Sequence, residues 1–281
     1  MKIAVASGKG GTGKTTVSTA IALTIGESVF LDADVEEPDA HIFLKPKIER
    51  THSVPIMIPR VDYSKCDFCG ECAKACAYNA IAVVPGKVLI FDEVCKGCGT
   101  CTIACPQRAI YEVPREIGVI NEGWVDGKIH FFEGKLNIGE SATTYLIREL
   151  KKFAKTDQDV VIDAPPGTSC PMLEATKFVD FVILVAEPTP FGVYDLNLSI
   201  QALEDTGLKL GIVVNKYGIG NDDVFKLAEK YGIPVLMKIP FDRELAAAYS
   251  KGVPLPVAKP EIKSELKRMV DEIRNMVGGG A

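Results

Sequence analysis

Apolar residues in this chain fall into short runs that alternate with segments of helical periodicity. The runs have the length of buried strands, and the segments between them repeat apolar positions every three or four residues. Predicted strands lie at 2–6, 28–34, 159–163, 178–186, 210–215 and 234–240, and predicted helices at 15–26, 141–154, 193–205, 222–231 and 261–277. Strands that alternate with helices of about a dozen residues predict βαβ units and an α/β fold with a mostly parallel sheet flanked by helices.

One block of the chain breaks this pattern. Residues 55–116 are bounded by prolines, contain eight of the nine cysteines and show no long helical periodicity. Because strand and helix patterns lie on both sides of the block, it is an insertion and not a terminal fusion. We expect an α/β domain made of residues 1–54 and 117–281, interrupted by a small inserted domain at 55–116.

Net charge and the distribution of apolar residues argue against a nucleic-acid-binding or membrane protein. The 281 residues carry a net charge of −5 with both signs spread along the chain, so we expect no nucleic-acid partner. The most apolar stretch, 178–186, is too short to cross a bilayer. The first residues turn glycine-rich without an apolar signal segment, so a cytoplasmic protein without membrane insertion is expected.

A glycine-rich loop joins the first predicted strand to the first predicted helix. Residues 8–15 read GKGGTGKT and match the G-x4-G-K-[ST] pattern of a phosphate-binding loop, or P-loop. Glycine N–H groups can wrap an anion without Cβ atoms in the way, and the helix N-terminus adds positive potential. Lys14 is expected to reach the β- and γ-phosphates of ATP, and the Thr15 hydroxyl to bind Mg²⁺. The other nucleotide contacts expected here are Gly8, Gly10, Gly11, Thr12, Gly13 and Thr16.

The same loop also contains the G-x-G-x-x-G pattern of dinucleotide-binding domains, with Asp32 following 19 residues after the last glycine. Three features favour the P-loop instead. The lysine and two threonines at 14–16 supply the remaining P-loop elements. Strand 159–163 ends in Asp163, and Gly167 follows shortly after, as in a nucleotide switch. Lys9 is a cation inside the loop, where a dinucleotide domain has no use for one.

With Lys9, the loop resembles the deviant P-loop of the MinD, ParA, Mrp and nitrogenase iron-protein superfamily, over nearly all of residues 1–54 and 117–260. In that superfamily the early lysine reaches the nucleotide of the opposite subunit, which implies a homodimer across the nucleotide. The resemblance also implies that Asp32 and Asp34 form the first switch and that Asp34 orients the attacking water. It further implies that Asp163 is the carboxylate of the second switch, that Gly167 senses the γ-phosphate and that Asp39 lies near the Mg²⁺ shell. By the same resemblance, the adenine base is bound by Asn215, Pro240 and Asp242.

Some of these residues have plainer interpretations that the sequence leaves open. Asp39 could cap the helix that begins near His41. Asn215 could be a turn residue after its strand, and Asp242 could be the N-cap of a helix.

The inserted block contains a repeat. Four cysteines spaced C-x2-C-x2-C-x3-C occur twice, 29 residues apart. The spacing resembles that of bacterial ferredoxins, which bind [4Fe–4S] clusters. The resemblance implies that one cluster is held by Cys66, Cys69, Cys72 and Cys105, and the other by Cys95, Cys98, Cys101 and Cys76. The first motif lacks the proline that ends the second, and structural zinc is the alternative because zinc sites also use C-x2-C pairs.

Two further features stand outside these motifs. Cys170 lies seven residues after Asp163, and we expect a small buried residue behind the second switch; the alternative is a thiol or metal-transfer site whose exposure depends on the nucleotide. The C-terminal helix has one apolar face and a polar face of mixed charge, so we expect it to dock on the protein and not on a membrane.

The motifs together favour a Mg²⁺-dependent ATPase in which nucleotide-driven switching of a dimer is coupled to electron transfer through two [4Fe–4S] clusters. Its partner is then a redox or cluster-accepting protein. An iron–sulfur carrier of the Mrp type is the alternative, in which a labile cluster is delivered to other proteins. A third possibility is a positioning ATPase whose clusters only hold the inserted domain together.

Overall fold

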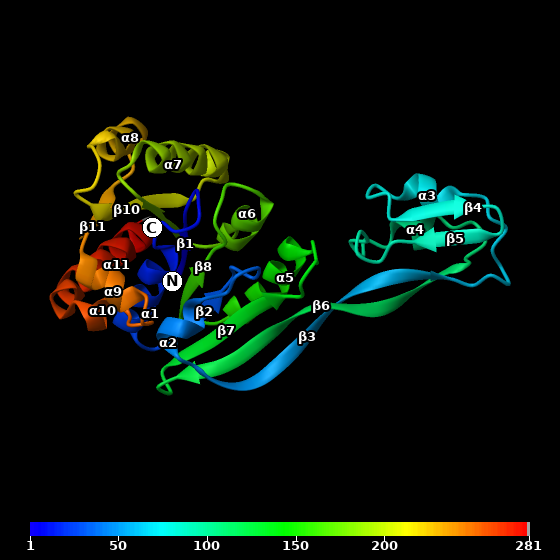
Figure 1. Ribbon diagram of the computed structural model, residues 1–281, viewed down its shortest axis with the longest axis horizontal. Helices are drawn as coiled ribbons and strands as arrows, with labels where there is room; N and C mark the ends of the chain where they lie inside the picture. The colour runs from blue at the N-terminus through cyan, green and yellow to red at the C-terminus, as the bar shows by residue number, and fades with distance from the viewer. Residues whose placement is uncertain (280–281) are drawn as a thin grey trace. The chain divides into compact units, whose positions relative to one another are not determined.

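The computed structural model describes residues 1–279, and the chain divides into two compact units (Figure 1). The first unit consists of Met1–Thr51, Ile120–Lys135 and the chain from Ile147 onward, and the second of His52–Val119 and Leu136–Leu146. The cysteine-rich block therefore lies within the second unit, and the P-loop lies in the first.

The first unit is built on a mostly parallel sheet, as predicted. Within the described residues nine strands follow the order β11-β10-β9-β1-β8-β2-β7-β6-β3. All the pairings from β11 through to β7 are parallel. The strands are β1 (Lys2–Ala6), β2 (Ser28–Asp32), β3 (Lys47–Val61), β6 (Ile110–Val125), β7 (Ile129–Leu136), β8 (Asp159–Asp163), β9 (Phe181–Ala186), β10 (Lys209–Tyr217) and β11 (Val235–Pro240).

Three strands at one end of this sheet were absent from the sequence-based prediction. Only residues 126–128 separate β6 from its neighbour β7, a connection that permits antiparallel pairing alone. The Asp62 N–H donates to the Ala109 carbonyl at 2.7 Å, near the end of β3 and the start of β6, so these strands are also antiparallel. Pro55 and Pro59, two of the prolines that bound the predicted insertion, lie inside β3, which tolerates them because it is the edge strand.

Helices cover both faces of the sheet. On one face, α1 and α11 share a buried core with Ile3, Val5 and Phe30, while α6 and α7 pack against β1, β8 and β9 (Figure 1). The helices are α1 (Lys14–Ile25), α2 (Ala40–Leu44), α5 (Thr143–Leu150), α6 (Cys170–Thr176), α7 (Pro190–Leu203), α8 (Asp223–Tyr231), α9 (Arg243–Tyr249), α10 (Leu255–Ala258) and α11 (Lys263–Gly278), with 3₁₀ turns at Lys151–Ala154, Glu204–Thr206 and Pro260–Ile262. The sequence-based prediction missed α6 and α10, it gave α9 only as the helix that Asp242 could cap, and it merged α5 with the turn that follows.

The prediction that the C-terminal helix docks on the protein is confirmed. The apolar face of α11 is buried in the core that it shares with α1, through Leu266, Met269, Val270 and Ile273. No helix in the described part of the chain is both long and apolar enough to cross a membrane.

The second unit is small and internally repeated. Helix α3 (Glu71–Ala75) and helix α4 (Thr100–Ala104) follow equivalent cysteines of the two motifs, and an antiparallel hairpin of β4 (Ile81–Val84) and β5 (Lys87–Ile90) lies between them in the chain. Each helix is preceded by a glycine with positive φ, 80° at Gly70 and 72° at Gly99, a conformation that other residues rarely adopt.

Truncating Leu266 to alanine tests the docking of α11. The side chain is fully buried, so Leu266→Ala is expected to lower the free energy of unfolding by about 2–5 kcal/mol. The exposed neighbour provides the control, because Lys267→Ala is expected to change that free energy by less than about 0.5 kcal/mol. Urea unfolding followed by circular dichroism measures both, and equal stabilities of the two variants would contradict the docking.

Candidate functional site

The sheet brings the predicted P-loop and two predicted switch carboxylates to one edge. β1 pairs with β8 and β2 pairs with β8, with Val5 and Asp32 both in register with Asp163. Because the strands are parallel, their carboxyl ends lie together, and open α/β sheets bind ligands at that edge. The loop that follows Ala6 therefore begins beside Asp32 and Asp163.

The loop glycines have two separate tasks. A Cβ atom on Gly8 would lie 2.3 Å from the Asp195 carbonyl oxygen, and one on Gly13 would lie 2.1 Å from the amide nitrogen of Asn215. Gly13 also has a φ of 92° at the N-cap of α1. Gly10 and Gly11 meet no atom within 4 Å, so they leave their side of the loop open. The loop thus packs tightly on the protein and stays clear where phosphate is expected.

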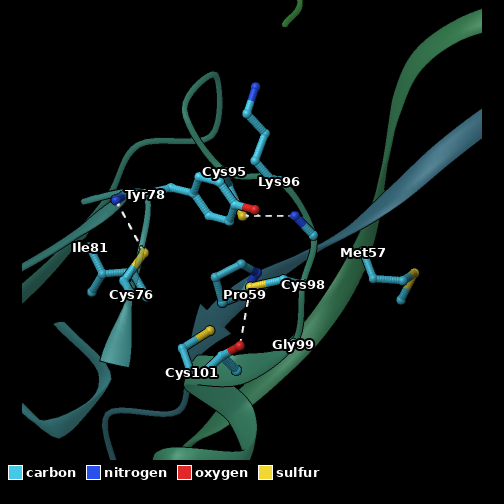
Figure 2. A pocket seen from close by; sticks show the side chains of 13 residues that line it. Met57, Pro59, Cys76, Tyr78, Ile81, Cys95, Lys96, Cys98, Gly99 and Cys101 are labelled. Atoms are coloured by element: carbon cyan, nitrogen blue, oxygen red, sulfur yellow. Dashed lines mark hydrogen bonds between the residues drawn. The ribbon is translucent and has the colours of Figure 1, made fainter. Parts of the chain in front are cut away.

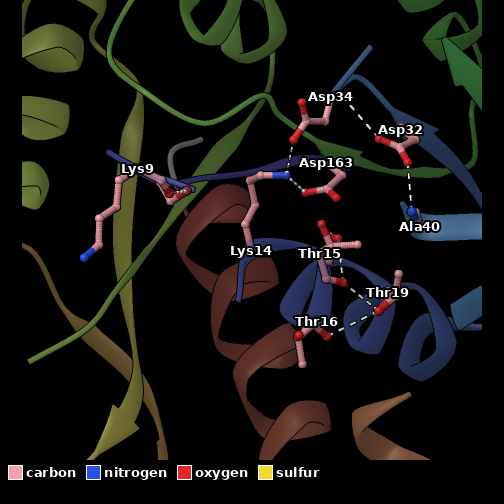
Figure 3. Close-up of polar contacts among 11 residues, drawn as sticks. Lys9, Lys14, Thr15, Thr16, Thr19, Asp32, Asp34, Ala40 and Asp163 are labelled. Atoms are coloured by element: carbon pink, nitrogen blue, oxygen red, sulfur yellow. Dashed lines mark hydrogen bonds and ion pairs between the residues drawn. The ribbon is translucent and has the colours of Figure 1, made fainter. Parts of the chain in front are cut away.

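Lys14 is the buried cation of this site. Its side chain is 7% exposed, and its ammonium group lies 2.9 Å from Asp163 Oδ1 and 3.4 Å from Asp34 Oδ2 (Figure 3). Burial alone lowers the pKa of Lys14, but the charges of Asp163, Asp34 and Asp32 outweigh it, and the pKa lies above its usual value. Lys14 therefore stays charged.

The carboxylates around Lys14 outnumber it. Burial raises the pKa of Asp163 and of Asp32, whose side chains are fully buried, and it raises the pKa of Asp34 to about 6. Asp32 accepts hydrogen bonds from the backbone N–H groups of Asp34 at 3.2 Å and Ala40 at 3.0 Å (Figure 3). The site holds an excess of acidic groups that one ammonium cannot balance.

Three buried oxygens here lack a hydrogen-bond partner among the described residues: Thr12 Oγ1, Asp39 Oδ1 and Asp163 Oδ2. Buried polar atoms in proteins are nearly always satisfied, so unpaired ones point to a ligand, a metal or water. Asp39 stands at the N-cap of α2, yet its side chain makes no cap hydrogen bond. The helix-cap interpretation of Asp39 is therefore wrong for its side chain, and these oxygens fit the surroundings of a Mg²⁺–nucleotide complex.

Lys9 does not join the buried cluster. Figure 3 shows its side chain turned away from Lys14, and its ammonium lies 3.5 Å from Glu187 Oε2. Glu187 also pairs with Lys216, whose ammonium donates to the Gly11 carbonyl at 3.1 Å. Sequence reasoning missed Glu187 and Lys216, because neither belongs to a motif and only the fold brings them to the loop.

A cleft of about 320 Å³ lies beside the P-loop. Three predicted adenine residues, Asn215, Pro240 and Asp242, line it, and so do Phe241 and Tyr249, which were not predicted. Its size suits a nucleoside, and its lining combines apolar walls with a few polar groups.

The polar residues of the cleft also have structural roles. The Asn215 amide nitrogen donates to the Thr12 carbonyl at 2.7 Å, so this side chain supports the P-loop. Asp242 Oδ1 accepts the N–H of Glu244 at 2.8 Å and caps α9, which is the plainer interpretation that the sequence left open. The Gly167 N–H, expected at the γ-phosphate, donates to the Ser7 carbonyl at 2.9 Å.

The eight clustered cysteines line two small cavities in the second unit. Each cavity takes three cysteines from one motif and the fourth from the other, and Figure 2 shows the second set converging. The sets are Cys66, Cys69, Cys72 and Cys105 in one cavity, and Cys76, Cys95, Cys98 and Cys101 in the other.

Equivalent backbone groups face the sulfurs of the two sets. The Ala80 N–H donates to Cys76 Sγ and the Ala109 N–H donates to Cys105 Sγ, both at 3.3 Å. Tetrahedral zinc, with a Zn–S bond of about 2.3 Å, needs sulfurs about 4 Å apart. Within residues 1–279 no three His, Cys, Asp or Glu side chains are close enough together to hold one metal ion. Four thiols line each cavity, which is the number of protein ligands that a structural zinc ion or a [4Fe–4S] cluster takes.

The prediction that Cys170 is buried is wrong. Its side chain is exposed at the first position of α6, because the segment after Asp163 leaves the core gradually and reaches the surface at Ser169. The sequence shows only that Cys170 lies seven residues after the end of a buried strand, and this spacing does not predict whether the side chain is exposed.

The chain is similar to several known proteins. An uncharacterized protein of Methanocaldococcus jannaschii is 32% identical over 99% of this chain and 98% of its own length. An iron-sulfur cluster carrier protein of Synechocystis is 26% identical over 93% of this chain and 66% of its own length. The solved septum site-determining protein MinD of Pyrococcus horikoshii, in complex with Mg-ADP, has a TM-score of 0.60 at 19% identity, covering 100% of this chain and 98% of that chain.

The likeness to the solved MinD concerns the fold alone, which is the predicted P-loop NTPase fold. Family membership rests on a match to the CobQ/CobB/MinD/ParA nucleotide-binding domain that extends over residues 3–255. This chain therefore belongs to the CobQ/CobB/MinD/ParA family of P-loop nucleotide-binding domains.

Proposed function

We propose that this protein is a Mg²⁺-dependent ATPase that holds two [4Fe–4S] clusters in its second unit and couples nucleotide state to electron transfer through them. The observation that carries the proposal is the division of eight cysteines into two cavities, four in each, on a chain that also has a P-loop.

The nucleotide side of the proposal assigns a role to each group at the sheet edge. Lys14 and the loop N–H groups bind the phosphates, and Thr15 and Asp39 hold Mg²⁺. Asp34 lies at the surface end of the acidic cluster and orients the attacking water. Phosphoryl transfer needs such positioned charges more than it needs covalent chemistry.

Nucleotide binding also gives a reason for the backbone to move. The Gly167 N–H must leave the Ser7 carbonyl if it is to donate to a γ-phosphate. Because α6 begins three residues later at Cys170, a shift of Gly167 moves the start of this helix. Segments that rearrange when a γ-phosphate arrives are the common switch of P-loop proteins.

The homodimer is proposed from Lys9. Its side chain is about one third exposed and points away from the phosphate site of its own chain, with Glu187 as its ion-pair partner (Figure 3). A lysine in that position can serve the nucleotide of a second copy, as the resemblance to the deviant P-loop family implies. The dimer then closes only when both copies hold nucleotide.

The cluster side of the proposal rests on the ligand sets. Each cavity offers four thiols, which is a complete set for one cubane cluster and leaves no position open. A bound [4Fe–4S] cluster accepts and releases one electron at a time. The short distance between the two motifs in the chain keeps both clusters in one small unit, which suits passage of electrons between them.

A carrier function is the second candidate. Relatives that match this chain include iron-sulfur cluster carrier proteins, such as that of Synechocystis, which matches 93% of the chain. In a carrier the cluster is cargo, so it must leave readily. The complete cysteine sets favour retention, and the named relatives favour delivery.

Paired cysteine substitutions test the proposed ligand sets. Cys69→Ala and Cys105→Ala remove ligands of the same cluster, so each variant is expected to lose about half of the iron and the double variant no more. Cys69→Ala combined with Cys76→Ala affects both sets and is expected to lose nearly all. Iron and sulfide analysis after anaerobic reconstitution measures this. Zinc in place of iron, or equal losses of iron in both double variants, would contradict the proposed ligand sets.

The raised pKa of Asp34 predicts a pH dependence. Asp34 must be ionised to take a proton from the attacking water, and with a pKa of about 6 it becomes protonated as the pH falls through that value. The kcat/KM for ATP is therefore expected to drop about tenfold per pH unit below about 6.

Two variants test whether Asp34, and not another acidic group of the protein, causes the loss of activity at low pH. Asp34→Asn is expected to lower kcat by about 10²–10⁴-fold and to remove the acidic limb of the profile. Asp223→Asn, at an exposed carboxylate paired with Lys226, is expected to keep both the rate and the limb. If kcat/KM of Asp34→Asn still fell below pH 6 as it does in the unaltered protein, another group would be responsible for the pH dependence.

Coupling is tested by measuring cluster reduction potentials in the presence of ADP and of a non-hydrolysable ATP analogue. We expect different potentials in the two states, no difference in Lys14→Ala, and iron that stays with the protein when an apo-ferredoxin is added. Rapid transfer of iron to the apo-ferredoxin would establish the carrier function instead. Retained clusters with identical potentials would leave an ATPase in which the clusters are structural.

A further inference from the structure

A basic groove lies in the first unit, away from the nucleotide site. Its volume is about 340 Å³, and residues at the start of β1 and at or after the C-terminal ends of α5 and α6 line most of it. Lys2 opens β1 whereas the P-loop follows Ala6 at the other end of this strand, so at about 3.3 Å per residue the two sites are about 13 Å apart or more. The charged lining residues are Lys2, Arg148, Lys151, Lys152, Lys155, Glu174 and Lys177.

This lining is strongly one-sided in charge. Six of its side chains are cations and one is a carboxylate, although the whole chain carries a net charge of −5. Arg148 is held by Glu174 through two contacts of 3.3 Å, and Lys152 pairs with Glu149 outside the lining. These two cations are therefore neutralised locally.

The remaining cations lack acidic partners. Among residues 1–279 no carboxylate lies within ion-pair distance of the ammonium groups of Lys2, Lys155 or Lys177. Asp180 accepts the backbone N–H of Lys2 at 2.7 Å and offsets part of this charge. Like charges gathered without counter-ions repel, so the groove is favourable for an anionic ligand.

Lys151 forms the floor of the groove and has a structural explanation. Its ammonium donates to the backbone carbonyls of Glu174 and Lys177 at the end of α6, a usual way to satisfy terminal carbonyls. Burial lowers its pKa to about 8, with Glu174 opposing the shift and the charges of Lys177 and Lys2 adding to it. The capping role accounts for Lys151 but not for the unpaired lysines around it.

An exposed aromatic ring stands at the same place. Phe178 is 81% exposed, and its φ of 61° is unusual for a bulky residue, so the backbone is constrained where it holds this ring outward. The Lys177 ammonium lies 5.1 Å from the ring centroid. An exposed aromatic residue among cations is the composition of protein interface anchors.

We propose that this groove is the docking site for an acidic segment of a protein partner, with Phe178 contacting an apolar side chain of that segment. The unpaired lysines supply charge complementarity, which speeds encounter and selects the partner. A duplex nucleic acid fits less well, because it needs a long track of cations and this acidic chain offers only one small group of them. The inference is independent of the proposed ATPase and cluster functions.

A peptide-binding measurement on the full-length protein tests the proposal. The probe is a fluorescein-labelled peptide of glutamates with one central tryptophan, and its anisotropy is measured at about 50 mM salt, where screening is weak. The double variant Lys155→Glu/Lys177→Glu is expected to bind about tenfold more weakly or worse. The control Lys251→Glu/Lys267→Glu makes the same change in net charge at exposed lysines and is expected to bind within about twofold of the unaltered protein.

A second pair of probes tests the aromatic anchor. Phe178→Ala is expected to weaken binding of the tryptophan-containing peptide about threefold or more and to leave an all-glutamate peptide unaffected. Should a charge-reversed protein fail to fold, Lys155→Gln/Lys177→Gln serves in its place, with circular dichroism as the check of folding.

Several outcomes would overturn the proposal. These are the absence of peptide binding to the unaltered protein, equal losses in the groove and control variants, and binding of both peptides that is insensitive to Phe178→Ala. Tighter binding of a DNA duplex than of the peptide, lost in the groove variant, would make the groove a nucleic-acid site instead. None of these results depends on ATP turnover or iron content, so failure here and failure of the proposed function remain distinguishable.

Discussion

The buried ion pair between Lys14 and Asp163 is the interaction on which the first unit is organised. Both groups are removed from water, and the cost of burying charge is met only if each stays close to an opposite charge. The sheet provides this by ending β8 beside β1, so that the loop returns its lysine to the carboxylate. Asp32 and Asp34 then add carboxyl groups that Lys14 does not balance, and this makes the edge of the sheet favourable for a further cation.

A path of hydrogen bonds leads from this charge cluster toward the strands that continue into the second unit. Asp32 accepts the N–H of Ala40 at the start of α2, and the next residue, His41, contacts Glu133 through Nδ1 at 2.6 Å. Asn121 on β6 donates to the same carboxylate at 3.1 Å and accepts from Thr51 on β3 at 3.0 Å. β3 and β6 both run on into the cysteine-bearing unit. These contacts connect the Asp32 carboxylate with the parts of β3 and β6 that belong to the first unit.

The sequence predicted those parts of the molecule whose signals are local. The P-loop follows from consecutive residues, and the parallel sheet follows from runs of apolar residues with helices between them. The long strands β3 and β6 were missed because their pairing joins distant segments and because the prolines in β3 resemble a boundary until its edge position is known. Glu187, Lys216 and Tyr249 were missed for a similar reason, since only the fold brings them to the nucleotide site. Cys170 was misjudged because exposure depends on the path of a loop, which periodicity does not describe.

The second unit bears on the choice between electron transfer and cluster delivery. Its buried apolar core is small, with Ile81, Val88 and Ile110 as its aliphatic members, and Cys101 belongs to that core itself. Units of this size usually need a metal or disulfide to be stable. Each cavity also joins cysteines of both motifs, so neither half of the repeat is complete without the other. If clusters occupy these cavities, releasing one removes a link between the two halves and exposes part of the core. A unit built in this way favours clusters that stay in place over clusters that leave readily.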